Sequence, residues 1–123
     1  MAFLGEPAAT SFAELWPIRR MPLVVDDGRS VVESTIIIEH LDLHHAGSVR
    51  LLPDDRDAAL EVRFMDRFFD NYVMTAMQKP VSEALRAEGA RKEETMAEAC
   101  QALDAAYAWL EVRLSGRAWA AGE

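Results

Sequence analysis

The sequence predicts an α+β fold in which a β-hairpin and a helix are followed by an all-helical part. Two observations lead to this prediction. An Asp-Gly pair at positions 27–28 separates two runs rich in β-branched residues, which is a strong signal for a tight hairpin turn. The composition also changes near residue 53, because four of the five prolines lie up to that point and Ala, Glu, Arg and Leu dominate after it.

The first half of the chain contains the hairpin and its neighbouring helices. A short helix is expected over residues 10–16, where Pro17 ends it. The run 21–25 is predicted to be the first strand and 29–32 the returning strand. Glu33-Ser34-Thr35 then opens a helix that ends near the histidines and Gly47.

The second half is predicted to form two long antiparallel helices. Asp54 and Asp55 precede the first helix, whose unpaired N–H groups favour acidic caps, and Pro80 is its internal breaker. Gly89 is expected to separate it from a second helix that ends at Gly116. The apolar arc of the first helix is wide enough for two sides to be covered, one of them by a second subunit. The expected stripes are Val62, Met65, Phe69, Tyr72 and Ala76, beside Leu60, Phe64 and Phe68, on the first helix, and Met96, Ala99, Leu103, Ala106 and Leu110 on the second.

Composition excludes several classes of protein. The 123 residues include 13 Lys and Arg against 21 Asp and Glu, a net charge of −8, so the basic footprint of a nucleic-acid binder is missing. No stretch approaches the roughly 20 apolar residues of a membrane span. The single cysteine, Cys100, cannot form an internal disulfide and favours the cytoplasm. Because Cys100 adjoins an apolar stripe, we expect a packed thiol.

The most informative local pattern joins Met21-Pro22 to Glu33-Ser34. A proline at the start of a strand can take the cis form. The free N–H groups of a helix N-terminus and the Ser34 hydroxyl suit a carboxylate, and Glu33 beside them suits an ammonium group. A ligand with an amino group and a carboxylate on one carbon would match the pair. The competing interpretation is a plain helix start, where Ser and Glu are favoured anyway.

Residues 20–41 resemble the glutathione-binding stretch of glutathione S-transferases. In that family a Val-Pro pair with a cis-proline precedes a hairpin, and a Glu-Ser or Gln-Ser pair opens the next helix. Here Met21 replaces the valine, and Glu33-Ser34 matches. The segment 51–53 and the helix after it also resemble the passage into the family's C-terminal domain.

The resemblance implies a domain organisation. Residues 1–46 would be the C-terminal part of a thioredoxin-like glutathione-binding domain, 47–53 a linker, and 54–123 the first part of an all-α C-terminal domain. The sequence would then cover the middle of a longer chain and be incomplete at both ends. The family's thiolate-stabilising Tyr, Ser or Cys lies before the matching segment, so no catalytic residue is assigned.

The resemblance also implies the contacts to glutathione. Glu33 and Ser34 would hold the γ-glutamyl amino and carboxylate groups. The backbone of Met21, just before a cis-Pro22, would pair with the cysteinyl part in strand fashion. Arg20, or its neighbour at position 19, stands where the family often has a basic or polar residue near the ligand.

The implied function is conjugation of reduced glutathione, as a substrate, to a small hydrophobic electrophile. The electrophile would lie between the domains, against Phe68, Tyr72 and Met77. The protein would be a cytoplasmic homodimer with no nucleic-acid or membrane partner. Two alternatives remain open: a non-catalytic interaction module on the same fold, or a glutathione-dependent isomerase, dehalogenase or peroxidase.

Three histidines, at positions 40, 44 and 45, invite a metal-binding interpretation, because residues i and i+4 share a helix face. No third ligand accompanies them at a suitable spacing, and histidine near a helix C-terminus is favoured by the helix dipole. We therefore expect a structural role for the histidines and predict no metal.

Overall fold

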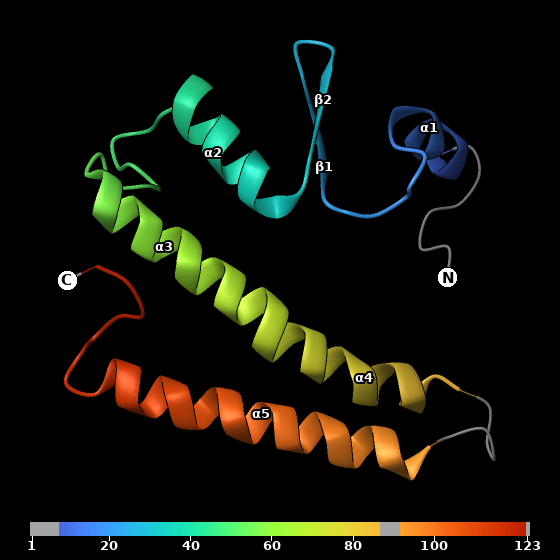
Figure 1. Ribbon diagram of the computed structural model, residues 1–123. Helices are drawn as coiled ribbons and strands as arrows, with labels where there is room; N and C mark the ends of the chain where they lie inside the picture. The colour runs from blue at the N-terminus through green and yellow to red at the C-terminus, as the bar shows by residue number, and fades with distance from the viewer. Residues whose placement is uncertain (1–7, 87–91, 123) are drawn as a thin grey trace. The chain divides into compact units, whose positions relative to one another are not determined.

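The computed structural model describes residues 8–86 and 92–122 (Figure 1). The chain divides into two compact units, Met1–Leu52 and Pro53–Glu123, and each unit is described by itself. The predicted end of the first long helix at Gly89 lies outside the described residues.

The first unit is built around a two-stranded antiparallel hairpin. Leu23 pairs with Val32 and Asp26 pairs with Arg29, which leaves a two-residue turn. Both turn residues have positive φ, 46° for Asp27 and 77° for Gly28, and two such residues define the turn that matches the twist of a hairpin. The hairpin prediction is confirmed. The elements of this unit are α1 (Ala8–Leu15), β1 (Leu23–Asp26), β2 (Arg29–Val32) and α2 (Ser34–His44).

Helix α2 follows β2 after a single residue and packs back against that strand. Val31 and Ile37 are the buried apolar side chains of this unit among the described residues. Because α2 runs back along the hairpin, its C-terminal end returns to the Asp-Gly turn, while its N-terminal end stays at the open end of the hairpin (Figure 1). The predicted start of this helix at residues 33–35 is confirmed.

The buried Asp42 of α2 binds the segment that leaves the first unit. Its carboxylate accepts hydrogen bonds from the Leu51 N–H at 2.8 Å, the Leu52 N–H at 3.4 Å and Arg50 Nε at 3.1 Å. The hydrogen bond from the Leu51 N–H is the largest of the effects that hold the pKa of Asp42 below its ordinary value. Residues 50–52 are therefore fixed to α2 by one side chain.

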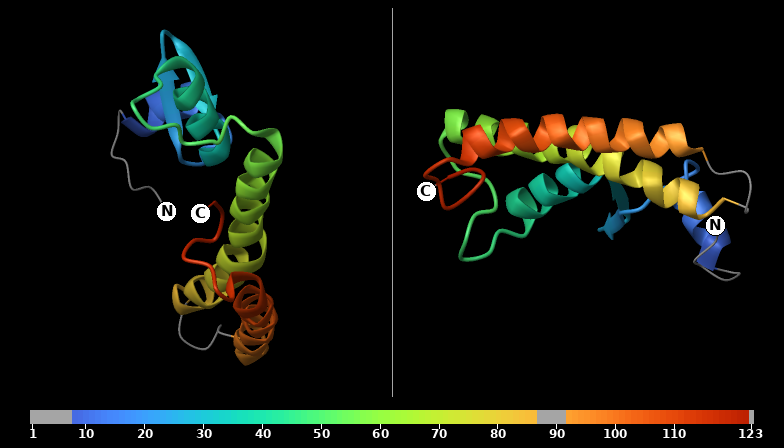
Figure 2. Two further views of the ribbon diagram at one scale, coloured as in Figure 1. Left: turned by 90° about the vertical axis from the view of Figure 1, so that its left-hand side faces the viewer. Right: turned by 90° about the horizontal axis from the view of Figure 1, so that it is seen from below.

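The second unit is an antiparallel pair of long helices. Figure 1 and the right-hand view of Figure 2 show α5 running beside the continuous helix formed by α3, η1 and α4, and α5 packs against η1 and α4. Asp55 caps α3 by accepting a hydrogen bond from the Ala58 N–H at 2.8 Å, as the sequence predicts. Gly116, with φ 74°, ends α5 as predicted, whereas Pro80 lies inside α4 without breaking it. The elements are α3 (Arg56–Phe68), η1 (Phe69–Met74), α4 (Thr75–Ala84) and α5 (Glu93–Leu114).

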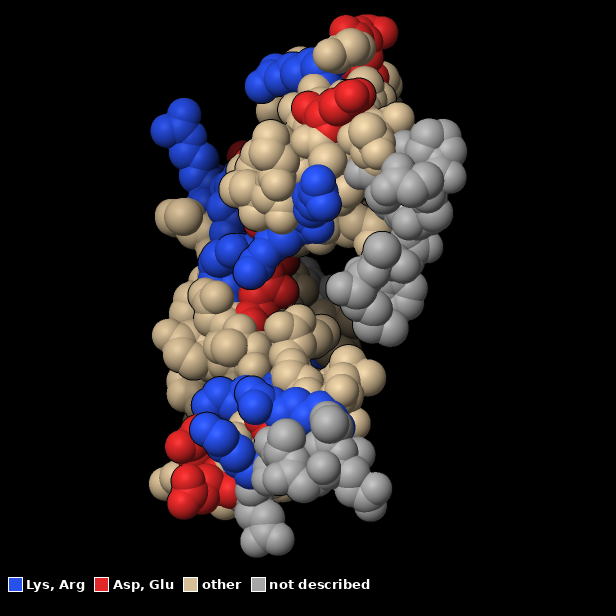
Figure 3. All heavy atoms as spheres, turned by 90° about the vertical axis from the view of Figure 1, so that its right-hand side faces the viewer, with Lys and Arg blue, Asp and Glu red and all other residues tan. Residues whose placement is uncertain are grey.

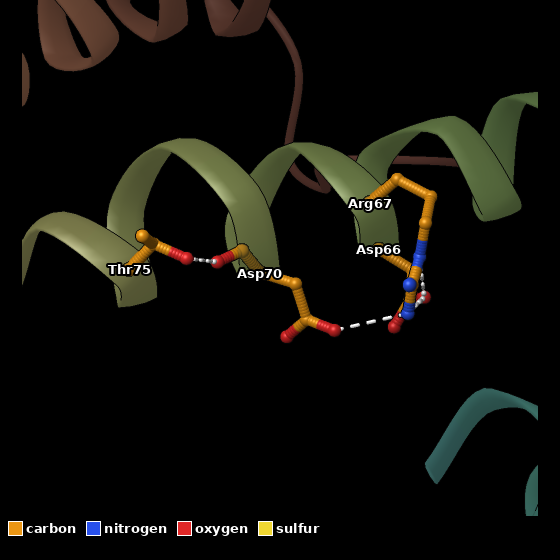
Figure 4. A network of polar contacts seen from close by, with 4 residues as sticks. All are labelled: Asp66, Arg67, Asp70 and Thr75. Atoms are coloured by element: carbon orange, nitrogen blue, oxygen red, sulfur yellow. Dashed lines mark hydrogen bonds and ion pairs between the residues drawn. The ribbon is translucent and has the colours of Figure 1, made fainter. Parts of the chain in front are cut away.

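The segment η1 is a π-helical turn (Figure 4). The Asp70 carbonyl accepts the backbone N–H of Thr75, five residues on, and also the Thr75 hydroxyl at 2.9 Å. Arg67 Nη2 donates to the Asp70 carboxylate at 2.9 Å. A π turn contains more residues than an α turn, so it shifts the helix face that points inward.

This shift explains why the predicted stripe is wrong at Phe69 and Tyr72. The core joins Met65 and Phe68 to Ala106 and Leu110, and the next inward residue after Phe68 is Val73, five positions later. A spacing of five is that of a π turn, whereas the predicted stripes assume 3.6 residues per turn throughout. The stripe prediction is also wrong at Leu60, Phe64 and Met96, which are exposed and lie outside the π turn.

The buried residues of α5 are Ala99, Ala106 and Leu110 among those that the structure describes. Ala99 is completely buried, and Cys100, one position on, is exposed. The prediction of a packed thiol is wrong because one helical step rotates the side chain by about 100° away from the buried face. Within the described part of the chain, no helix has the length and apolar character needed to cross a membrane.

Candidate functional site

The open end of the hairpin brings the two predicted sequence pairs together. Because Leu23 pairs with Val32, the next residues outward on the two arms are Pro22 and Glu33, followed by Met21 and Ser34. The Met21–Pro22 peptide bond is cis, as predicted. Residues that are eleven or more positions apart in the sequence thus flank one end of the same small sheet.

Glu33 has an unusual backbone conformation at this end. Its φ of 70° and ψ of 124° lie on the left-handed side, where residues other than glycine are uncommon. Such a residue costs about 1–3 kcal/mol and occurs preferentially at functional sites. Its carbonyl accepts the Ile37 N–H at 2.9 Å, so Glu33 is the cap of α2 although its side chain makes no capping hydrogen bond.

Ser34 is the first residue of α2, where the N–H groups of the first turn have no partner within the helix. Together with the positive end of the helix dipole, these groups attract anions. The side chains of Glu33 and Ser34 are exposed and make no hydrogen bond or ion pair within the described residues. A helix start whose first N–H groups have no partner within the helix therefore lies beside a carboxylate that is unpaired among the described residues.

The segment before β1 is exposed as well. Met21 has 67% of its surface exposed, and it precedes the paired strand, which begins at Leu23. Its backbone is therefore outside the hairpin ladder. Arg19 has φ 56°, and both Arg19 and the predicted Arg20 are exposed.

The predicted electrophile residues lie in the second unit, where a groove of about 420 Å³ separates α5 from the η1 and α4 segments. Phe68 and Trp109 line the groove, and their rings stack with centroids 4.4 Å apart. Tyr72 also lines the groove, with its ring 5.2 Å from Phe68, whereas Met77 is exposed but does not line it. The sequence analysis did not identify Trp109 as a residue of this groove. Its position next to Leu110 of the predicted stripe was the signal that could have indicated it.

Charged groups of both signs lie close together on the face shown in Figure 3. In the second unit, ion pairs join different elements. Glu61 of α3 accepts hydrogen bonds from Arg113 at 2.7 Å and from Arg117 at 2.6 Å. The Arg117 hydrogen bond is the first cause that holds the pKa of Glu61 below its ordinary value.

A second polar cluster lies at the turn end of the hairpin. Asp26 Oδ2 accepts hydrogen bonds from Nε2 of His40 at 2.7 Å and of His45 at 2.8 Å. The His45 bond, followed by the His40 bond, lowers the pKa of Asp26, and Asp26 in turn raises the pKa of His45. Asp26 is therefore a third potential metal ligand beside the two histidines. Spacing along the sequence did not reveal it, because it reaches the histidines only through the packing of α2 on the hairpin.

Comparison with known protein families finds a match in the first half of the chain. The model described as "Glutathione S-transferase, N-terminal domain" matches residues 2–43. Glutathione transferase GST 23 of Zea mays is 30% identical over 125 residues, covering 98% of this chain and 53% of that protein. Glutathione S-transferase U10 of Arabidopsis thaliana is 31% identical over 85 residues, covering 68% of this chain and 37% of that protein. The chain spans about half the length, or less, of these relatives.

Solved structures agree with these matches. A glutathione S-transferase from Methylobacillus flagellatus, solved with GSH bound, superposes with a TM-score of 0.77 at 27% identity, covering 88% of this chain and 53% of that one. Glutathione S-transferase 1-6 from Anopheles dirus has a TM-score of 0.70 at 22% identity, covering 95% and 54%. The second similarity concerns the fold alone.

Proposed function

Because the chain belongs to the glutathione S-transferase family, we propose that the open end of its hairpin binds the γ-glutamyl end of glutathione. The hairpin unit is the thioredoxin-like part of that fold, and the helix pair belongs to its helical C-terminal part. The observation that carries the proposal is the juxtaposition of the cis Met21–Pro22 bond with Glu33 and Ser34 at one end of the sheet.

Each group at this end has a partner on the ligand. The ammonium group of the γ-glutamyl residue pairs with the Glu33 carboxylate, which has no partner within the described residues. The ligand's α-carboxylate accepts hydrogen bonds from the Ser34 hydroxyl and the first-turn N–H groups of α2. The Met21 backbone, which lies outside the hairpin ladder, pairs with the cysteinyl amide. Arg20 adds positive charge nearby.

The proposed reaction is conjugation of glutathione to a small hydrophobic electrophile. The thiol loses its proton to solvent, and the thiolate sulfur forms a bond to the electrophilic carbon while the leaving group departs with its bonding electrons. Phe68, Tyr72 and Met77 are the proposed electrophile contacts. We assign no residue of the described chain to lowering the thiol pKa.

We also propose a cytoplasmic homodimer. Leu60 and Phe64 are 61% and 47% exposed on α3, a large apolar surface to leave in water. The lone cysteine fits a reducing compartment. Sedimentation equilibrium should give twice the 13.7 kDa mass of the chain, and a monomer at all concentrations would contradict the dimer.

Isothermal titration of the chain with reduced glutathione tests the binding site. Ser34→Ala removes one hydrogen bond to a charged group, about 1.5–3 kcal/mol, so the dissociation constant should rise about 10- to 100-fold. Ser30→Ala, at an exposed position within β2, is the matched control and should leave affinity unchanged. Equal affinities of wild type and Ser34→Ala would refute the proposed contact.

A separate assay tests the reaction. Thioether formation from glutathione and chlorodinitrobenzene is followed by absorbance in the presence and absence of the protein. Acceleration that saturates with glutathione supports conjugation. If the protein binds glutathione tightly but does not accelerate thioether formation with this or any other electrophile, it would instead be a non-catalytic binding module.

A further inference from the structure

The turn end of the hairpin carries a cluster with the composition of a transition-metal site. One ligand atom each from Asp26, His40 and His45 lies within 4.8 Å of the others. Two imidazole nitrogens and one carboxylate oxygen are a common set of protein ligands for zinc in sites that keep one position open. This end of the hairpin is opposite to the proposed glutathione site, so the cluster is separate from that function.

We propose that Asp26, His40 and His45 bind a divalent transition metal ion, with zinc as the ion that the ligand set fits best. A tetrahedral zinc with bonds of about 2.1 Å separates its ligand atoms by roughly 3.4 Å. The present N–O separations of 2.7 and 2.8 Å would therefore open by about 0.6 Å as the ion replaces the two hydrogen bonds. Both imidazoles would then carry their remaining proton on Nδ1.

The surroundings allow this rearrangement. The His45 side chain is 51% exposed and follows the last residue of α2, so it can move, whereas the His40 side chain is 11% exposed and is held on the helix. Asp27 adds a second negative charge close enough to interact with His45. Three protein ligands leave a fourth position for water, which the exposed side of His45 can admit.

Such a site would link the end of β1 to the C-terminal end of α2. Asp26 ends β1, His40 lies in α2, and His45 directly follows the last residue of α2. A two-stranded hairpin is at best marginally stable in water by itself. A metal that binds only the folded state would therefore stabilise the first unit by mass action.

His44 provides the matched control. It is the same residue type, it is also exposed, and it lies next to His45, but its ligand atoms do not belong to the cluster. Its ring contacts His40 with centroids 4.5 Å apart. His44→Ala and His45→Ala therefore remove equal numbers of imidazoles, and only the second removes a proposed ligand.

The test is calorimetric titration of the chain with zinc chloride in a buffer without chelators. Wild type and His44→Ala should bind one zinc with affinities within about twofold, while His45→Ala and Asp26→Asn should bind at least about tenfold more weakly. Absence of saturable one-to-one binding by wild type would overturn the proposal, as would equal losses in His44→Ala and His45→Ala.

A second measurement does not depend on the folding of any variant. Long-range proton–nitrogen NMR spectra of the wild-type imidazoles, recorded before and after one equivalent of zinc, report which nitrogens bind. Shifts confined to Nε2 of His40 and His45 support the site. Unchanged imidazole signals, or an equal shift at His44, would contradict it.

Discussion

The left-handed backbone conformation of Glu33 leads to a prediction in which stability and glutathione affinity change in opposite directions. Glu33→Gly should stabilise the fold and weaken glutathione binding at the same time. Glycine adopts φ 70° without steric cost, so the substitution should relieve about 1–3 kcal/mol of backbone strain. The greater freedom of glycine in the unfolded chain opposes this by about 0.4–1 kcal/mol. The expected net gain is about 0.5–2 kcal/mol.

Urea denaturation followed by circular dichroism measures the stability, and calorimetry with reduced glutathione measures the affinity. Loss of the carboxylate that pairs with the ligand's ammonium should weaken binding about 10- to 100-fold, because hydrogen bonds to charged groups contribute about 1.5–3 kcal/mol. A variant that is both more stable and weaker in binding is the predicted result.

Asp27→Gly is the control for this experiment. Asp27 has φ 46°, but it lies in the hairpin turn away from the proposed glutathione site, and aspartate tolerates the left-handed region better than glutamate does. Its stability should change by less than about 0.5 kcal/mol, with affinity unaltered. A Glu33→Gly variant that is less stable than wild type would refute the strain argument.

Two further predictions concern the helical unit. Leu110 is 7% exposed and lies in the core with Phe68, so Leu110→Ala should lower the free energy of unfolding in urea by about 2–5 kcal/mol. Val112 is 80% exposed, and Val112→Ala should lower it by less than about 0.5 kcal/mol. Similar losses in the two variants would contradict the assigned core. The pKa of Glu61 is lowered in the folded state, so its stabilising effect is present above the ordinary pKa of 4.5 and is lost as pH falls through the lower folded value. Glu61→Gln should therefore be less stable than wild type at neutral pH, and the difference measured by urea denaturation should shrink under acid conditions; a difference that does not vary with pH would exclude the ion pairs as its cause.

Local sequence signals predicted the hairpin and the start of α2 well. The turn depends on two adjacent residues, Asp27 and Gly28, whose positive φ angles the sequence pair already favours. The end of α5 depends in the same way on Gly116. These features need no knowledge of the tertiary structure, because the residues that determine them are neighbours in the chain.

The features that were missed depend on contacts between distant residues or on a change of helical period. Asp26 and Asp42 look like ordinary surface acids in the sequence. The packing of α2 brings Asp26 to two histidines, and it brings Asp42 to the backbone N–H of Leu51. The π turn at 69–74 changes which side chains face inward, so Val73 is packed against the core and Tyr72 is exposed. A pattern that assumes a constant 3.6 residues per turn cannot show this.

The most direct test of the central claim compares two ligands on the wild-type chain. Reduced glutathione and cysteinylglycine differ by the γ-glutamyl residue, which is the part that Glu33 and Ser34 are proposed to hold. In amide NMR titrations, glutathione should shift the signals of residues 33–36 and bind at least about tenfold more tightly than cysteinylglycine. Equal affinities for the two ligands, or glutathione shifts that leave residues 33–36 unchanged, would contradict the proposed recognition of glutathione.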